Sequence, residues 1–154
     1  MTKLPYQNGT WFLVPLRRGG YGLGIVARHN RKGGVFGYFF GPKLDTSALE
    51  SAPHGRSAND RVLWGIFGDL GLLKGEWPII GSDPNWNPDS WPMPAFVRVD
   101  RAANIAFLSE YDPNTLKCLT ERKCNPELAS DHPPDSTMGY GLLESRLTDL
   151  LDPL

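Results

Sequence analysis

Residues 11–41 read WFLVPLRRGGYGLGIVARHNRKGGVFGYFFG, and this stretch decides the fold. It contains three apolar runs that are rich in β-branched or aromatic residues, and glycine-rich segments separate them. Short apolar runs that alternate with turns are typical of antiparallel strands. We therefore predict a three-stranded meander over residues 11–14, 21–29 and 35–41.

Residues 22–27, GLGIVA, also fit the G-x-G-x-x-A form of the dinucleotide-binding fingerprint. That motif needs a helix that begins at its glycines, so that backbone N–H groups meet the pyrophosphate. Here the helix would have to end at Gly33 after about two turns, and the β-branched Ile25 and Val26 disfavour it. We therefore predict a strand in which alternating glycines allow close packing on one face.

Apolar runs predict further strands along the rest of the chain. One lies at residues 61–67, and another at residues 77–80, where Pro78 places it at a sheet edge. Two runs that flank the turn-like DRAAN predict a hairpin of residues 95–99 and 105–111.

Prolines, glycines and polar residues mark the segments between these elements. Residues 42–60 and 82–94 predict surface loops, and the second contains four prolines. The pattern of residues 115–135 predicts no particular structure. With 40% hydrophobic residues and no dividing linker, residues 1–154 are expected to form one domain of the α+β class. Its sheet is expected to be curved and mainly antiparallel, with a barrel as one form that it could take.

A helix is predicted at the end of the chain, over residues 139–151. Five leucines fall on one stripe of this helix and are expected to be buried against the sheet: Leu142, Leu143, Leu147, Leu150 and Leu151.

Composition predicts a soluble, cytoplasmic protein. No apolar run approaches the roughly 18 residues of a membrane helix, and the first residues lack the apolar segment of a signal peptide. Cys118 and Cys124 fit neither a C-x-x-C pair nor half of a zinc site, so we expect reduced thiols.

Charge is distributed unevenly along the chain. The residues before Asp45 include seven of the 16 basic residues, whereas all 17 acidic residues lie from Asp45 onward. A basic half is consistent with nucleic-acid binding. The interpretation that we favour is that these basic residues pack beside acidic partners from later in the chain.

No pattern in the sequence predicts catalysis, a cofactor or a metal site. The three histidines, His29, His54 and His132, are isolated, and none has another histidine or cysteine at ligand spacing. The G-x-S-x-G motif of serine hydrolases does not occur. We therefore expect that the protein is not an enzyme.

One alternative function is single-stranded nucleic-acid binding by a β-domain. In the run RKGGVFGYFF, basic residues precede Phe36, Tyr38 and Phe40, which alternate onto one face of the predicted strand. Aromatic side chains beside cations are the groups that stack and neutralise a single strand. The same aromatics would serve equally as core residues, which is the interpretation that we favour.

Recognition of a protein partner is the remaining class, and two kinds of residue point to it. Trp86 and Trp91 lie on the proline-rich loop, which would lose little entropy on binding. Arg17 and Arg18 lie in the first predicted turn and would make charged contacts at the rim. The tryptophans could instead fold back as a lid over the sheet.

Several segments together resemble the immunity protein 26 family of bacterial polymorphic-toxin systems, some members of which carry a phosphotriesterase-type name. The segments are WFLVPLRRGGYGLGIVAR, GYFFGP, FGDLGLLKGEWPIIG, WPMPAFVR and GYGLLESRLTDLL, and they extend from about Trp11 to Leu151. The resemblance implies a cytoplasmic protein that binds and neutralises a cognate toxin without catalysis. It implies no catalytic residues and does not identify the toxin.

Overall fold

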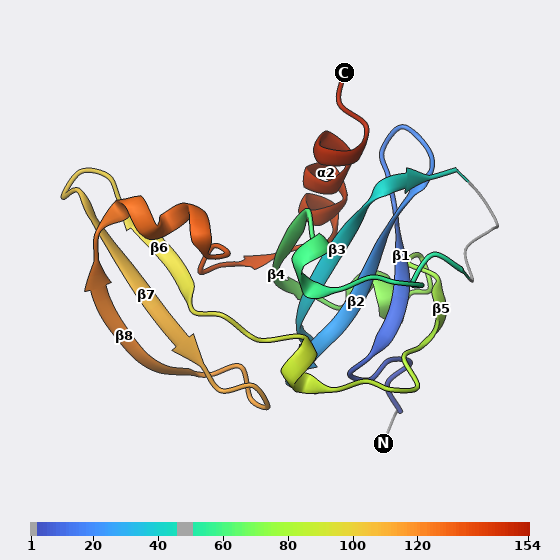
Figure 1. Cartoon of the computed structure of the whole chain (residues 1–154), viewed down its shortest axis with the longest axis horizontal. Helices are drawn as coiled ribbons and strands as arrows, with labels where there is room; N and C mark the ends of the chain where they lie inside the picture. The colour runs from blue at the N-terminus through green and yellow to red at the C-terminus, as the bar shows by residue number, and fades with distance from the viewer. Residues whose placement is uncertain (1–2, 46–50) are drawn as a thin grey trace.

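The computed structural model describes residues 3–45 and 51–154, which form two β-sheets and a C-terminal helix (Figure 1). The larger sheet has six strands in the order β5-β1-β2-β3-β4-β9. Its strands are β1 (Thr10–Pro15), β2 (Tyr21–His29), β3 (Gly34–Leu44), β4 (Leu63–Gly68), β5 (Ile79–Ser82) and β9 (Thr137–Met138). All pairs in it are antiparallel except β4–β9, which confirms the α+β class and the mainly antiparallel sheet.

The smaller sheet has three antiparallel strands in the order β6-β7-β8 and lies beside the larger one (Figure 1). Its strands are β6 (Phe96–Asp100), β7 (Ile105–Tyr111) and β8 (Cys118–Cys124). The helices that lie wholly within the described residues are α1 (Leu70–Leu73), α2 (Tyr140–Leu151) and three short 3₁₀ segments, η2 (Ala58–Asp60), η3 (Pro88–Ser90) and η4 (Pro126–Asp131).

The predicted meander is confirmed, because β1, β2 and β3 pair in order. Trp11 lies opposite Ile25, which in turn lies opposite Tyr38. Residues 22–27 are therefore the middle of a strand and not a phosphate-binding loop. A Cβ atom at Gly22 would lie 2.4 Å from Cδ2 of Leu147 in α2, so this glycine allows the helix to approach the sheet closely.

The alternation of side chains along β3 separates two cores on the two faces of the larger sheet. Phe39 belongs to the first core, whereas Phe36, Tyr38 and Phe40 belong to the second. Helix α2 packs against the first core. Because both faces are covered, the central strands are buried over most of their length.

Helix α2 is confirmed, but the prediction that all five of its leucines are buried is wrong. Leu143 and Leu147 are fully buried, and Leu151 packs against the first core. Leu142 and Leu150 are 48% and 50% exposed. Successive residues are about 100° apart around a helix, so a leucine directly before a buried one is turned away from the sheet.

Several boundaries differ from the predicted ones, among them those of β4, which spans residues 63–68 where 61–67 was predicted. Strand β3 continues to Leu44, in the segment predicted as loop 42–60, because Leu44 pairs with Tyr21 of β2. Residues 46–50 of that predicted loop lie outside the described residues. The strand predicted at 77–80 is β5, two residues later, although it does lie at an edge. Trp77 is instead fully buried in the first core.

The larger sheet ends at β5 and β9 and does not close into a barrel. Among the described residues, no helix combines the length and apolar character that crossing a membrane requires.

The predicted hairpin of β6 and β7 is confirmed, and β8 adds a third strand within the segment that predicted no structure. The buried core of this sheet consists of Val97, Ala106 and Leu108 only, with partly buried neighbours around it. Segment 133–135 covers the outer edge of β6: the Val97 N–H donates to Pro133 O at 2.9 Å, and the Asp135 N–H donates to Val97 O at 2.8 Å. The smaller sheet therefore has one covered edge and one edge formed by β8.

Candidate functional site

Trp91, predicted as a binding anchor, lies in the second core. Its side chain is 4% exposed, and its ring makes edge-on contacts with Trp11 at 5.9 Å, Tyr38 at 5.3 Å and Phe40 at 6.0 Å between centroids. These are favourable aromatic geometries. Trp91 therefore closes the sheet as a lid, and in this conformation it offers a partner almost no surface.

Trp86 is half-buried on the same side of the sheet and packs against the second core. The guanidinium carbon of Arg28 lies 5.6 Å from its ring centroid, within the range of a cation–π contact. Arg28 also donates to Pro88 O at 3.2 Å and so ties the tryptophan loop to β2. Burial lowers the pKa of Arg28 below its ordinary value. Arg28 could not be identified as a contact residue from the sequence, because a lone arginine in a strand forms no recognisable pattern.

Arg17 and Arg18 connect the β1–β2 turn to α2. The guanidinium of Arg17 donates to Gly141 O at 2.8 Å and lies 3.3 Å from the Glu144 carboxylate. Arg18 lies 3.6 Å from the Asp152 carboxylate. The predicted packing of early basic residues beside later acidic ones therefore holds for these two arginines.

The four predicted contact residues do not form one surface. Trp86 and Trp91 pack on the second core, whereas Arg17 and Arg18 contact the helix that covers the first core on the opposite face. The side chains of Arg17 and Arg18 are 52% and 36% exposed. Both arginines are accessible to a partner, but each is already engaged with α2.

The aromatic strand that would stack nucleic-acid bases is covered. Phe36, Tyr38 and Phe40 are all fully buried. Burial raises the pKa of Tyr38 to about 12. In this conformation, β3 therefore offers no exposed aromatic surface to a single strand.

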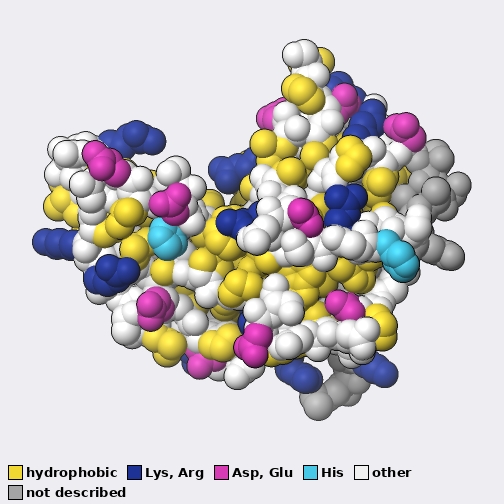
Figure 2. All heavy atoms as spheres, viewed as in Figure 1, with side chains coloured by type: hydrophobic (Ala, Val, Ile, Leu, Met, Phe, Trp, Pro, Cys, Tyr) yellow, Lys and Arg dark blue, Asp and Glu magenta, His cyan; other side chains and the backbone are white. Residues whose placement is uncertain are grey.

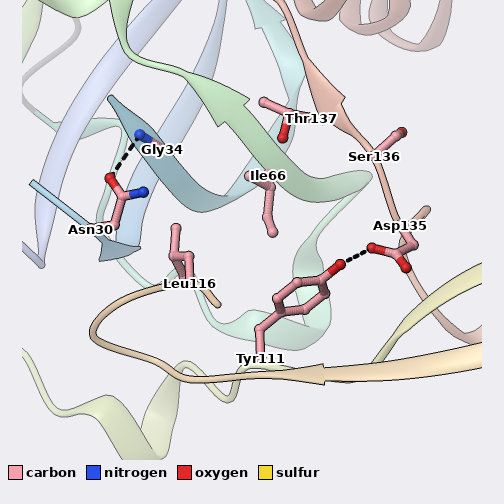
Figure 3. Close-up of a pocket in the computed structure, with 8 residues that line it drawn as sticks. All are labelled: Asn30, Gly34, Ile66, Tyr111, Leu116, Asp135, Ser136 and Thr137. Atoms are coloured by element: carbon pink, nitrogen blue, oxygen red, sulfur yellow. Dashed lines mark hydrogen bonds between the residues drawn. The ribbon is translucent and has the colours of Figure 1, made fainter. Parts of the chain in front are cut away.

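A pocket of about 280 Å³ lies between the two sheets (Figure 3). The Tyr111 hydroxyl of β7 donates to the Asp135 carboxylate on one wall, and burial is the main cause that raises the pKa of Tyr111. On another wall, Asn30 Oδ1 accepts from the Gly34 N–H at 2.9 Å. The polar groups named on these walls are thus already paired, Asn30 with Gly34 at the larger sheet and Tyr111 with Asp135 at the smaller one.

A second polar cluster lies at the end of β2. The Tyr6 hydroxyl donates to Asp69 Oδ2 at 2.7 Å, and the Tyr6 ring meets the His29 ring edge-on at 5.2 Å between centroids. Burial is the main cause that lowers the pKa of His29, and its Nδ1 has no hydrogen-bond partner among the described residues. His132 lies elsewhere, where its Nδ1 is 3.1 Å from Ala95 O. Within the described ranges, no group of three or more His, Cys, Asp or Glu residues could hold a metal ion.

The smaller sheet carries a charged surface. The Arg98 guanidinium lies 4.3 Å from the Phe107 ring centroid and 3.4 Å from the Glu121 carboxylate, which also accepts from the Ser109 hydroxyl at 3.2 Å. Figure 2 shows Lys and Arg side chains at the outer end of this lobe. This surface could not be predicted from the sequence, because residues 115–135 lack the apolar alternation that marks a strand.

Comparison with known protein families gives a match. The model of the family described as immunity protein 26 matches residues 7–107 of the 154-residue chain. The matched residues extend from just before β1 into β7 and include the tryptophan loop. No curated protein and no solved structure matches.

Proposed function

Because the chain belongs to the immunity protein 26 family, we propose that it binds a cognate bacterial toxin and neutralises it by covering its active surface. The observation that carries this proposal is the family match over more than half of the chain. The proposed complex forms in the cytoplasm, and the protein contributes surface and charge, with no catalysis of its own. A stable complex of this kind buries about 800 Å² on each partner.

The predicted contact residues remain proposed contacts, with different degrees of access. Arg17 and Arg18 reach solvent at the β1–β2 turn and could add toxin carboxylates to their existing partners. Trp86 presents part of its ring, whereas Trp91 could reach a toxin only if its loop moved away from the second core.

The test is rescue from a candidate toxin domain, which is sought at the end of a large reading frame directly upstream. This domain is expressed in a bacterial host with and without the present chain. We expect growth to stop in its absence and to resume in its presence, and the two purified proteins to elute as one complex. A host that still dies, with the chain present in folded form, would contradict the immunity function.

Titration separates neutralisation by covering from neutralisation by catalysis. Residual toxin activity is measured as purified chain is added in increasing amounts. We expect activity to fall in proportion to the added chain and to vanish near equimolar amounts, because each molecule covers one toxin. Complete inactivation by a small fraction of an equivalent would contradict the non-catalytic mechanism. A toxin from an unrelated family, which the chain should not inhibit, is the control.

A further inference from the structure

Strand β8 is exposed on both faces and unpaired along one edge. Residues 118–123 are all exposed, and Cys124 is partly exposed. Within the part of the chain that the structure describes, β8 pairs with β7 alone and ends its sheet. Figure 1 shows it at the outer margin of the molecule, away from the larger sheet. Its outward N–H and C=O groups are therefore available to another strand.

The other sheet ends are less open. Strand β5 has four residues and β9 has two, whereas β8 has seven. The outer edge of β6 is covered by segment 133–135 through two hydrogen bonds. Strand β8 is thus the longest uncovered edge among the described strands, and such an edge is a template for strand addition.

The charges along β8 favour an acidic partner. Glu121 is already paired with Arg98 and accepts from Ser109. Arg122 and Lys123 lie opposite Leu108 and Phe107 of β7, so no carboxylate faces them across that ladder. Neither cation makes an ion pair with any described residue. Opposite charges on directly paired strands are stabilising, and like charges are destabilising.

A second copy of the chain fits this edge poorly in the registers that are centred on its charged residues. A symmetric pair of β8 strands centred on Glu121 would place that carboxylate opposite its own copy. Centring the pair on Arg122 would do the same for two guanidinium groups. Glu121 could meet Lys123 of the other copy only in this second register, where the two guanidinium groups oppose each other.

We propose that the open edge of β8 is a docking strand for an extended, acidic segment of the toxin, which adds to the smaller sheet as a fourth strand. This inference rests on the proposed function, since it takes the toxin as the partner. The added strand would place carboxylates opposite Arg122 and Lys123, while its backbone satisfies the outward groups of β8. The family match ends at residue 107, so β8 lies outside the matched residues. A contact that is specific to one toxin is expected in such a part of the chain.

Charge reversal tests the acidic partner. The probe is the purified toxin domain whose lethality the chain relieves in the rescue test, and its affinity is measured by calorimetry. We expect the double variant Arg122→Glu/Lys123→Glu to bind about tenfold more weakly or worse. The matched control, Lys3→Glu/Lys32→Glu, makes the same change in net charge on exposed residues outside the smaller sheet. We expect this control to bind as the wild type does, and both variants to keep the wild-type melting temperature.

Hydrogen exchange tests the strand pairing itself. In the complex, alternate amides of residues 118–124 are expected to exchange more slowly, because every second N–H of an edge strand points outward. If the β8 variant binds more weakly but these amides of the wild-type complex are not protected, the contact is made by side chains alone. That result would overturn the proposal. Equal binding of both variants would also overturn it, while the immunity function would stand. A wild-type chain that does not bind the toxin would instead contradict the proposed function.

Nucleic acid is the other partner that a basic edge could attract. Fluorescein-labelled oligothymidine is titrated with the wild type and with the β8 double variant at low salt. We expect no binding to the wild type. If the wild type binds the oligonucleotide and the β8 variant does not, the proposal is overturned, because Arg122 and Lys123 would then belong to a nucleic-acid surface.

Discussion

The two sheets of this protein differ in how much of their surface they bury. The larger sheet is covered on both faces, and its central strands carry fully buried aromatic side chains on each side. The separate core of the smaller sheet has three buried residues, since Phe96 of β6 packs in the second core, and every residue of β8 reaches solvent. Burial of apolar surface is the main source of stability. The larger sheet therefore holds the fold together, while the smaller sheet keeps backbone and charge available to a partner.

The largest expected effect is the loss of stability when a core residue of the larger sheet is truncated, compared with the same change in the smaller sheet. Phe12 is fully buried and stacks on Trp77 at 5.7 Å between ring centroids. We expect Phe12→Ala to lower the free energy of unfolding by about 3–5 kcal/mol. Leu108→Ala, in the core of the smaller sheet, should lower the free energy of unfolding by about 2 kcal/mol, which is near the low end for leucine-to-alanine substitutions in a core. Urea denaturation measures both, and an equal or larger loss at Leu108 would break the comparison.

Close packing inside the larger sheet has the next largest expected effect. A Cβ atom at Gly24 would lie 2.6 Å from Phe12 Cζ and 3.0 Å from Phe39 Cε1, and both rings are fully buried. We expect Gly24→Ala to destabilise the fold by about 1–3 kcal/mol through overpacking. A Cβ at Gly68 in β4 meets nothing within 4 Å, so Gly68→Ala is the matched control and should change stability little. A harmless Gly24→Ala would mean that this face can open to admit a side chain.

The smallest expected effect is a pH dependence that originates in the larger sheet. Burial lowers the pKa of His29 from its ordinary value of 6.5, and Arg31 adds to this, while Asp69 opposes it. The unfolded chain therefore takes up a proton at a higher pH than the folded chain does. Stability contributed by neutral His29 is present above pH 6.5 and decreases as the pH falls from there toward the lower pKa of the folded state. We expect a shallower loss on acidification in His29→Gln, measured by denaturation at several pH values, and an identical slope would contradict this assignment.

The spacing of apolar residues along the chain predicted those strands and helices in which the spacing matches the period of the element. The runs at β1, β2 and β3 were identified as strands, and so were the hairpin of β6 and β7 and the helix α2. In each, apolar residues recur with the period that the element itself imposes. Strand β8 breaks that rule, because it is exposed on both faces and has no buried face to mark in the sequence.

The candidate surfaces were less predictable, because composition does not specify which way a loop folds. Two tryptophans on a proline-rich loop are compatible with an anchor or with a lid, and contacts with Trp11, Tyr38 and Phe40 make Trp91 a lid. The position of α2 likewise decided that Arg17 and Arg18 contact the helix. Both outcomes depend on residues far away in the sequence.

The sequence by itself determined the class of fold, the strand identity of residues 21–29 and the resemblance to a family, because these properties follow from local periodicity and from the order of segments. Only the tertiary structure decided that Gly22 makes room for α2, that Trp91 is buried and that β8 ends its sheet uncovered. The physical reason is that burial and edge exposure are relations between distant segments. The type of a residue limits whether it can be buried or lie at an exposed edge, but the residues that surround it in space decide which of the two occurs.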